Sequence, residues 1–348
     1  MTRTVLVTGA TGFIAQHVLD NLLKKGFTVI GTARSEAKYA PLLEEFSKKY
    51  PEGKLSFAIV PDISTPDAFD EVLKENSEID AVLHTASPFS FGLSTSLEDG
   101  YLNPAVNGTV NVLNAIYKYA PQVTNVVITS SFAAIKRPGD EYTSVVHTSE
   151  TWNPVKWEEV TTELEAYPAS KTYAEKAARE FVEKNKPNFK LATVNPPYVF
   201  GPQTFDRFVG PVLNTSNEIL NTISKVDPTT TEPVKILTAL AVDVRDVAEF
   251  HVRPLEDPRL ESERLFIVSE PVTGQSILNI LNDKVPQFKG KIAKGDPAQT
   301  DALIKKDCPP YDLTNLYNAI GDYDFIPLEK SIVDIYDQYF RVNSASSA

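Results

Sequence analysis

The segment that most constrains the fold lies at the start of the chain, where a β-branched run passes into a glycine turn and then a helical pattern. Thr4–Thr8 is typical of a buried strand, and the apolar spacing after the turn predicts a helix ending at Gly26. Gly9 and Gly12 let the backbone approach a pyrophosphate, to which the helix amino terminus presents its N–H groups. The position of this turn predicts a dinucleotide site formed by Gly9, Thr11, Gly12, Phe13 and Ile14.

Further strand and helix patterns alternate along the first two hundred residues, which is typical of a doubly wound α/β sheet. The predicted strands are Thr4–Thr8, Thr28–Ala33, Leu55–Val60, Ala81–His84, Asn125–Ser130 and Lys190–Asn195. We therefore expect a Rossmann-type parallel sheet over residues 1–200, with contributions returning around 234–256. Isolated strands near 234–242 and 264–269 indicate a smaller C-terminal α/β cap for the substrate over residues 201–342.

Two helices have clear boundary signals. Asn103 suits an N-cap and Pro104 the first helical position, so the pattern predicts a helix to Tyr119. The segment Leu328–Val342 carries an apolar face that should dock on the core, followed by a frayed tail over residues 343–348. Pro254 should end the helix that follows Asp246 early.

Composition and charge exclude several classes of protein. The 348 residues are 42% hydrophobic and 23% charged, as in an ordinary globular protein, and the net charge of −12 disfavours binding to nucleic acid or anionic lipid. One cysteine and four scattered histidines predict neither a disulfide nor a metal site. No apolar run is long enough to span a membrane, and a strand pattern almost at Met1 leaves no room for a signal peptide, so we expect a cytoplasmic protein.

The second predicted strand indicates which dinucleotide is bound. It runs into Arg34, with Lys38 four residues later and Glu36 as the nearby acid. An arginine here suits a ribose 2′-phosphate, whereas an acid suits a 2′-hydroxyl, so we expect NADPH rather than NADH. At two further carboxyl strand ends, Asp62-Ile63 should lie near the adenine and Thr85-Ala86-Ser87 should border the cofactor.

Tyr167 and Lys171 form a candidate proton-transfer pair at the start of a helical segment, Thr172–Lys184, with Pro168 at the first helical position. A phenol has an ordinary pKa of about 10, and we expect the lysine ammonium and the helix amino terminus to lower it. Tyr50 and Lys54 have the same spacing, but they lie in a Pro/Gly turn that offers no helix to align them. The fifth strand ends in Thr129-Ser130-Ser131, and a serine hydroxyl there would bind a carbonyl oxygen while tyrosine donates the proton.

Together these motifs resemble the extended short-chain dehydrogenase/reductase family over nearly the whole chain, although Ala15 replaces the third glycine common in that family. Gly12-Phe13-Ile14-Ala15-Gln16-His17 and the run 85–89 are most similar to the yeast NADPH-dependent aldehyde and ketone reductases of the methylglyoxal/3-methylbutanal reductase type, which resemble plant dihydroflavonol reductases. The resemblance implies a catalytic triad of Ser131, Tyr167 and Lys171, with Ser131 preferred to Ser130. It also implies that Pro196 and Val199 hold the nicotinamide amide through backbone groups.

We therefore expect an NADPH-dependent carbonyl reductase that converts aldehydes and ketones to alcohols, as a monomer or a homodimer. Phe89, Phe132 and Tyr198 should line an apolar substrate pocket with cap residues from about 209–218. An alternative is an epimerase or dehydratase of sugar nucleotides that retains NAD. A non-catalytic NADPH-binding redox sensor is a second alternative, although such proteins typically lack the tyrosine–lysine pair.

Overall fold

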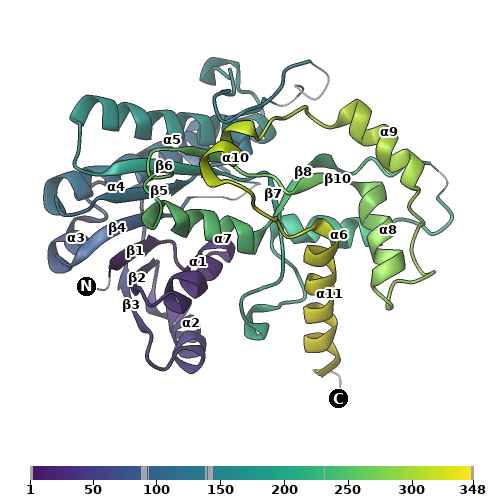
Figure 1. Cartoon of the computed structure of the whole chain (residues 1–348), viewed down its shortest axis with the longest axis horizontal. Helices are drawn as coiled ribbons and strands as arrows, with labels where there is room; N and C mark the ends of the chain where they lie inside the picture. Colours follow the sequence, from purple (N-terminus) through teal and green to yellow (C-terminus); the bar gives the residue numbers. More distant parts are fainter. Residues whose placement is uncertain are drawn as a thin grey trace.

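A parallel sheet of seven strands forms the centre of the computed structural model, which describes residues 3–87, 92, 94–137, 139, 144–230 and 232–345 (Figure 1). The strand order is β3-β2-β1-β4-β5-β6-β9, so the order reverses between β1 and β4 and opens a crevice at their carboxyl ends. This confirms the predicted fold class. The strands are β1 (Thr4–Thr8), β2 (Thr28–Ala33), β3 (Lys54–Ile59), β4 (Ile79–His84), β5 (Asn125–Thr129), β6 (Lys190–Asn195) and β9 (Arg264–Phe266).

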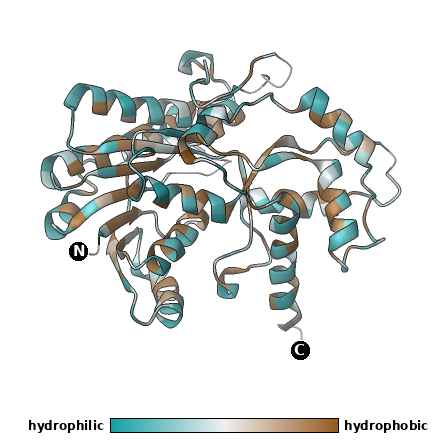
Figure 2. Ribbon diagram, viewed as in Figure 1, coloured by the Kyte–Doolittle hydropathy of each residue, from teal (hydrophilic) through white to brown (hydrophobic). Residues whose placement is uncertain are grey.

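Helices cover both faces of this sheet because its strands are apolar on both sides. Val5 and Val7 face one core cluster, while Leu6 between them faces the other. In Figure 2 the strands of the large sheet are mostly hydrophobic, whereas the helices around it carry both hydrophobic and hydrophilic residues. On the first face lie α1 (Phe13–Lys24), α2 (Glu36–Lys49) and α7 (Val244–Val252), and on the second α3 (Asp70–Glu75), α4 (Asn103–Tyr119) and α5 (Glu163–Asn185).

A smaller part lies beside the carboxyl edge of the large sheet and has its own core (Figure 1). Its sheet has the order β10-β8-β7, and buried side chains of α11 pack there, including Ile332 and Tyr336. One strand expected in the cap belongs elsewhere, because β9 pairs in parallel with β6 in the large sheet. The elements of this part are β7 (Tyr198–Phe200), β8 (Thr238–Asp243), β10 (Glu270–Thr273), α6 (Thr215–Ser224), α8 (Gly274–Lys284), α9 (Pro297–Asp307) and α11 (Leu328–Ala345).

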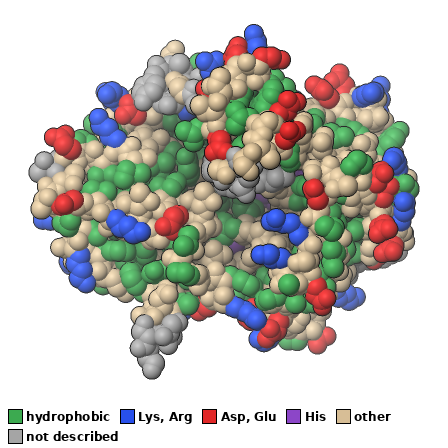
Figure 3. Space-filling model, turned by 180° about the vertical axis from the view of Figure 1, so that it is seen from behind, with side chains coloured by type: hydrophobic (Ala, Val, Ile, Leu, Met, Phe, Trp, Pro, Cys, Tyr) green, Lys and Arg blue, Asp and Glu red, His purple; other side chains and the backbone are tan. Residues whose placement is uncertain are grey.

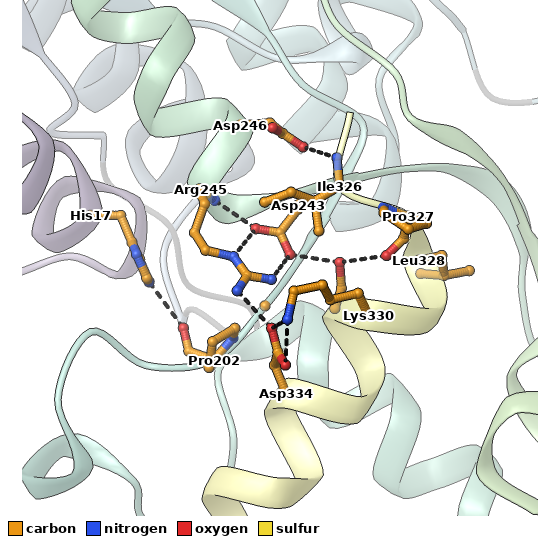
Figure 4. Close-up of polar contacts among 12 residues, drawn as sticks. His17, Pro202, Asp243, Arg245, Asp246, Ile326, Pro327, Leu328, Lys330 and Asp334 are labelled. Atoms are coloured by element: carbon orange, nitrogen blue, oxygen red, sulfur yellow. Dashed lines mark hydrogen bonds and ion pairs between the residues drawn. The ribbon is translucent and has the colours of Figure 1, made fainter. Parts of the chain in front are cut away.

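Polar contacts fasten α11 to the start of α7 (Figure 4). The side chain of Asp243 is fully buried and accepts hydrogen bonds from Arg245 and Ser331, whose hydroxyl lies 2.6 Å away. Arg245 also pairs with Asp334 of α11 at 2.6 Å. The carboxylate of Asp246 accepts a hydrogen bond from the Ile326 amide at 2.9 Å. These contacts fix the smaller part relative to the helix layer of the large sheet.

Several predicted boundaries differ from the observed ones. Asn103 does not cap its helix, because the five-residue π-helix Glu98–Leu102 runs directly into α4. Pro168 lies inside α5, which begins at Glu163 behind a capping box formed by Thr162 and Glu165. The last helix continues to Ala345, beyond the predicted end. Pro254 does end α7 early, in the 3₁₀ turn Arg253–Leu255.

Candidate active site

The glycine turn has the geometry that a bound dinucleotide requires. Gly9 has a φ of +63°, and a Cβ atom on it would lie only 2.8 Å from the Cα atom of Ala86. Gly12 is the N-cap of α1 and supplies no side chain to its amides. Thr11 precedes it, and Phe13 and Ile14 form the first residues of the helix. The turn therefore presents backbone amides at a helix amino terminus, which fits the phosphates of a dinucleotide.

The two cations expected to bind a 2′-phosphate, Arg34 and Lys38, are both exposed. Arg34 directly follows β2, and Lys38 lies in the first turn of α2 behind the N-cap Ser35. Within the described part of the chain, neither side chain has an ion-pair partner. Two unpaired cations beside a helix amino terminus fit a phosphate group.

The residues expected beside the adenine and the cofactor follow β3 and β4 at the same sheet edge. Asp62 closes a tight turn by accepting the amide and hydroxyl of Ser64, and Ile63 is packed against α4 at Gly108. The hydroxyl of Thr8 lies 2.8 Å from Nδ1 of His84 and accepts the Ala86 amide at 3.1 Å. These bonds hold Ala86 against the glycine turn, and they make His84 a buried, hydrogen-bonded strand end.

A second bond anchors the same loop after β4. The hydroxyl of Thr85 donates to the carbonyl oxygen of Thr8 at 2.5 Å. The ends of β1 and β4 are thus joined by side chains as well as by backbone pairing. The loop holds Ser87 within reach of α5.

Ser131, Tyr167 and Lys171 come together at this edge. Ser131 caps the 3₁₀ turn Phe132–Ala134, and its hydroxyl is hydrogen-bonded to the phenol of Tyr167. Lys171, one turn after Tyr167 on α5, donates to the hydroxyl of Ser87 at 2.9 Å. Ser130 instead donates to the buried carboxylate of Glu175. The geometry therefore supports Ser131 rather than Ser130 as the serine of the triad.

Burial changes the acid–base properties of this pair. It raises the pKa of Tyr167, an effect that the hydrogen bond with Ser131 partly offsets. Burial also lowers the pKa of Lys171 to about 8. The expectation that the pKa of Tyr167 lies below its ordinary value is wrong for this structure, because the effect of burial dominates. At neutral pH the site holds a neutral phenol and a largely charged lysine.

The strand end expected to hold the nicotinamide is tied to the serine turn. The carbonyl oxygen of Pro196, just after β6, accepts the amide of Phe132 at 2.9 Å. Val199 is buried in β7, where it pairs with Val242 of β8. Pro196 thus lies on fixed backbone beside the serine turn, and Val199 lies in a paired strand of the smaller sheet. The second tyrosine–lysine pair has no such setting, because Tyr50 ends α2 and Lys54 begins β3.

The expected substrate contacts have different surroundings. Phe132 is buried and stacked on Phe266, with ring centroids 5.0 Å apart. Tyr198 is 41% exposed, and its phenol is close enough to Tyr167 to raise the pKa of that group electrostatically. Phe89 lies outside the described residues. Of the cap segment 209–218, Val212 is 71% exposed and Leu213 is buried.

Seen from behind, the surface is hollowed between the two parts of the chain, with basic side chains beside the hollow (Figure 3). Among the described residues, no cluster of three or more histidine, cysteine or acidic side chains is arranged to hold a metal ion. No helix within the described residues is both long enough and apolar enough to cross a membrane.

The sequence analysis missed two charged residues behind the triad, Glu175 and Arg264, which form a buried ion pair 2.7 Å long. One signal was present. Glu175 follows Lys171 by four residues, as Lys171 follows Tyr167, so all three share one helix face. The partner Arg264 is remote in sequence and carried no motif.

Comparison with known proteins places these features in context. Residues 5–268 match the NAD dependent epimerase/dehydratase family. The chain is 42% identical over 334 residues to the putative NADPH-dependent methylglyoxal reductase of Candida albicans, covering 95% of this chain and 96% of that one. It is 44% identical over 300 residues to the NADPH-dependent methylglyoxal reductase of Saccharomyces cerevisiae, covering 84% and 86%. The crystal structure of yeast methylglyoxal/isovaleraldehyde reductase complexed with NADPH superposes with a TM-score of 0.91 and 40% identity, covering 98% and 99%.

Proposed function

We infer, since this chain belongs to the NAD dependent epimerase/dehydratase family, that it is an NADPH-dependent carbonyl reductase acting on aldehydes and ketones through Ser131, Tyr167 and Lys171. The observation that carries the residue assignment is the hydrogen bond between Ser131 and Tyr167, one helical turn from the buried Lys171. Arg34 and Lys38 support a cofactor with a 2′-phosphate. They argue against the NAD-retaining alternative.

In the proposed site each residue has a distinct task. Bound NADPH supplies the hydride. Ser131 and Tyr167 donate hydrogen bonds to the carbonyl oxygen of the substrate, and Tyr167 then transfers its proton to that oxygen. Lys171 keeps a positive charge beside the phenol and favours the tyrosinate left behind. The product is an alcohol.

The cofactor would lie along the carboxyl edge of the sheet. The amides of the turn from Gly9 to Ile14 would bind the pyrophosphate, and Arg34 with Lys38 would bind the 2′-phosphate. Asp62 and Ile63 would border the adenine. The nicotinamide end would lie near Ser87, with its amide held by backbone groups of Pro196 and Val199.

We propose an apolar substrate pocket over the nicotinamide, lined by Phe89, Phe132, Tyr198 and the cap segment 209–218. The exposed Tyr198 ring next to Tyr167 supports this placement most directly. One face of the Phe132 ring is covered by Phe266, so that face is not offered to a substrate. We propose further that the protein is cytoplasmic and works as a monomer or a homodimer.

Replacing Tyr167 with phenylalanine tests the triad. The Tyr167→Phe variant loses only the hydroxyl, so we expect kcat for NADPH-dependent aldehyde reduction to fall by about 100-fold or more. NADPH binding, measured by fluorescence titration, should stay nearly unchanged. Tyr117→Phe is the matched control, because that ring is half exposed on α4. Retention of normal kcat in Tyr167→Phe would overturn the assignment of the proton donor.

A further inference from the structure

A buried carboxylate lies directly behind the proposed triad. Glu175 sits on α5 one turn after Lys171, and none of its side chain is exposed. Its Oε2 atom accepts hydrogen bonds from Ser130 Oγ at 2.5 Å and Asn195 Nδ2 at 2.8 Å. Its Oε1 atom accepts Arg264 Nε at 2.7 Å. One side chain thus joins α5 to the ends of β5 and β6 and to β9.

These partners are immediate neighbours of the proposed site residues. Ser130 precedes Ser131 in the chain, and Asn195 precedes Pro196. The same Asn195 amide also donates to the carbonyl oxygen of Ser131 at 3.2 Å. The Glu175 carboxylate therefore fixes the backbone on which Ser131 stands relative to the helix that carries Tyr167 and Lys171.

Arg264 holds the other end of the serine turn. Its guanidinium is buried, lies 3.9 Å from the ring centroid of Trp152 and donates to the carbonyl oxygen of Ala134 at 3.1 Å. Ala134 ends the 3₁₀ turn that Ser131 caps. The ion pair between Glu175 and Arg264 is therefore linked by hydrogen bonds to both ends of this turn, through Asn195 at Ser131 and directly at Ala134.

Stability alone does not explain a charged pair in this place. Removing two charges from water is costly, and well-packed apolar side chains of the same volume often hold a fold equally well. Burial by itself would raise the pKa of Glu175, but the charges of Arg264 and Arg179 and the hydrogen bonds from Arg264 and Ser130 together lower it, so the group stays ionised. An ionised carboxylate accepts several directional hydrogen bonds at once, which apolar packing cannot reproduce.

We propose that Glu175, paired with Arg264, is a positioning residue for carbonyl reduction that keeps the Ser131 hydroxyl in hydrogen-bonding reach of the Tyr167 phenol. It touches neither substrate nor cofactor and acts through Ser130 and Asn195. The inference rests on the proposed function, in which Ser131 and Tyr167 together bind the carbonyl oxygen.

The Glu175→Gln variant tests this role because it keeps the shape of the side chain and removes its charge. Its amide hydrogens must face groups that are donors in the native site, either Arg264 or Ser130 with Asn195. We expect kcat per NADPH-binding site to fall about tenfold to a hundredfold, as small misplacements of reacting groups do. The NADPH dissociation constant should stay within about twofold, and the isotope effect with 4-deuterated NADPH should be at least that of the unaltered protein. Glu180→Gln, an exposed position on α5, is the matched control and should behave as the unaltered protein.

A milder variant keeps the test decisive if Glu175→Gln does not fold. Ser130→Ala removes one hydroxyl that contacts Glu175, and it should lower kcat about threefold to tenfold with NADPH affinity unchanged. The unaltered protein is assayed first on a panel of aldehydes and ketones, and its inactivity would refute the proposed function itself. With an active parent, unchanged kcat in either folded variant would overturn the positioning role. The positioning role would also be overturned if each variant lost activity only in proportion to its loss of NADPH-binding sites. That pattern would mean that part of the protein is unfolded and that the folded part reacts normally.

Discussion

Replacing Arg34 with alanine probes how the chain distinguishes NADPH from NADH. The two cofactors differ by the 2′-phosphate, and Arg34 and Lys38 are the exposed cations at the end of β2 and the start of α2. The rest of the surface works against this phosphate, because the net charge is −12. We therefore propose that these two local cations supply most of the affinity for the phosphate.

The size of the effect follows from their exposure. A hydrogen bond to a charged group contributes about 1.5–3 kcal/mol, and solvent screening at an exposed site favours the lower end. About 1.5 kcal/mol corresponds to roughly a tenfold change in affinity. We expect Arg34→Ala to raise KM for NADPH about tenfold, and the double replacement with Lys38→Ala to raise it further, while KM for NADH changes less than about twofold.

Initial rates with each cofactor at saturating aldehyde measure these constants. Because the site is exposed, raising ionic strength from low salt should weaken NADPH binding to the unaltered protein more than to Arg34→Ala. Lys190→Ala removes an exposed charge at the amino end of β6, the opposite sheet edge, and controls for net charge. Equal increases in KM for NADPH and NADH would refute the phosphate role of Arg34.

Two further predictions concern pH. Burial lowers the pKa of Lys171 to about 8, so reduction should slow as pH rises through that value, and a kcat profile that stays flat to about pH 10 would contradict the role of its charge. Burial raises the pKa of Asp246 from 3.8 to about 6. Between these two pH values the carboxyl group is protonated in the native state but ionised in the unfolded state, and this difference stabilises the native state at low pH. The contribution of Asp246 to the free energy of unfolding is therefore lost as pH rises from about 4 through 6. At 1.36 kcal/mol per pKa unit, the loss is at most about 3 kcal/mol. The free energy of unfolding, measured with urea at a series of pH values, should depend less on pH between about 4 and 6 in Asp246→Asn. The exposed control Asp324→Asn should leave this pH dependence unchanged.

Local sequence signals were sufficient where local forces decide the structure. The predicted strands Thr4–Thr8, Thr28–Ala33 and Lys190–Asn195 match the observed bounds, because β-branched runs between turn residues carry their own boundaries. The start of α5 was missed for a related reason. Pro168 resembles a first helical residue, but the capping box at Thr162 and Glu165 is the stronger start signal, and the helix tolerates the proline in its second turn.

Signals that depend on distant partners were not available to the sequence analysis. The strand β9 has three residues, and only its pairing with β6 assigns it to the large sheet. Glu175 is one charged residue among many on a helix, and its partner Arg264 is 89 residues away. A sequence motif identifies the side chains proposed to perform the chemistry. The residues that position those side chains can be identified only from the folded structure, in which distant strands lie side by side.

In the proposed mechanism, the protonation states of the tyrosine–lysine pair suit the reduction of a carbonyl group. Burial disfavours charge on both members of the tyrosine–lysine pair, raising the pKa of Tyr167 and lowering that of Lys171. The phenol is therefore protonated at neutral pH, as the proposed role of proton donor requires. The lysine pKa of about 8 leaves most of the ammonium charged at neutral pH, where it favours the anion that proton transfer creates. In the same proposed mechanism, oxidation of an alcohol would begin from the tyrosinate, and burial disfavours that ionised form.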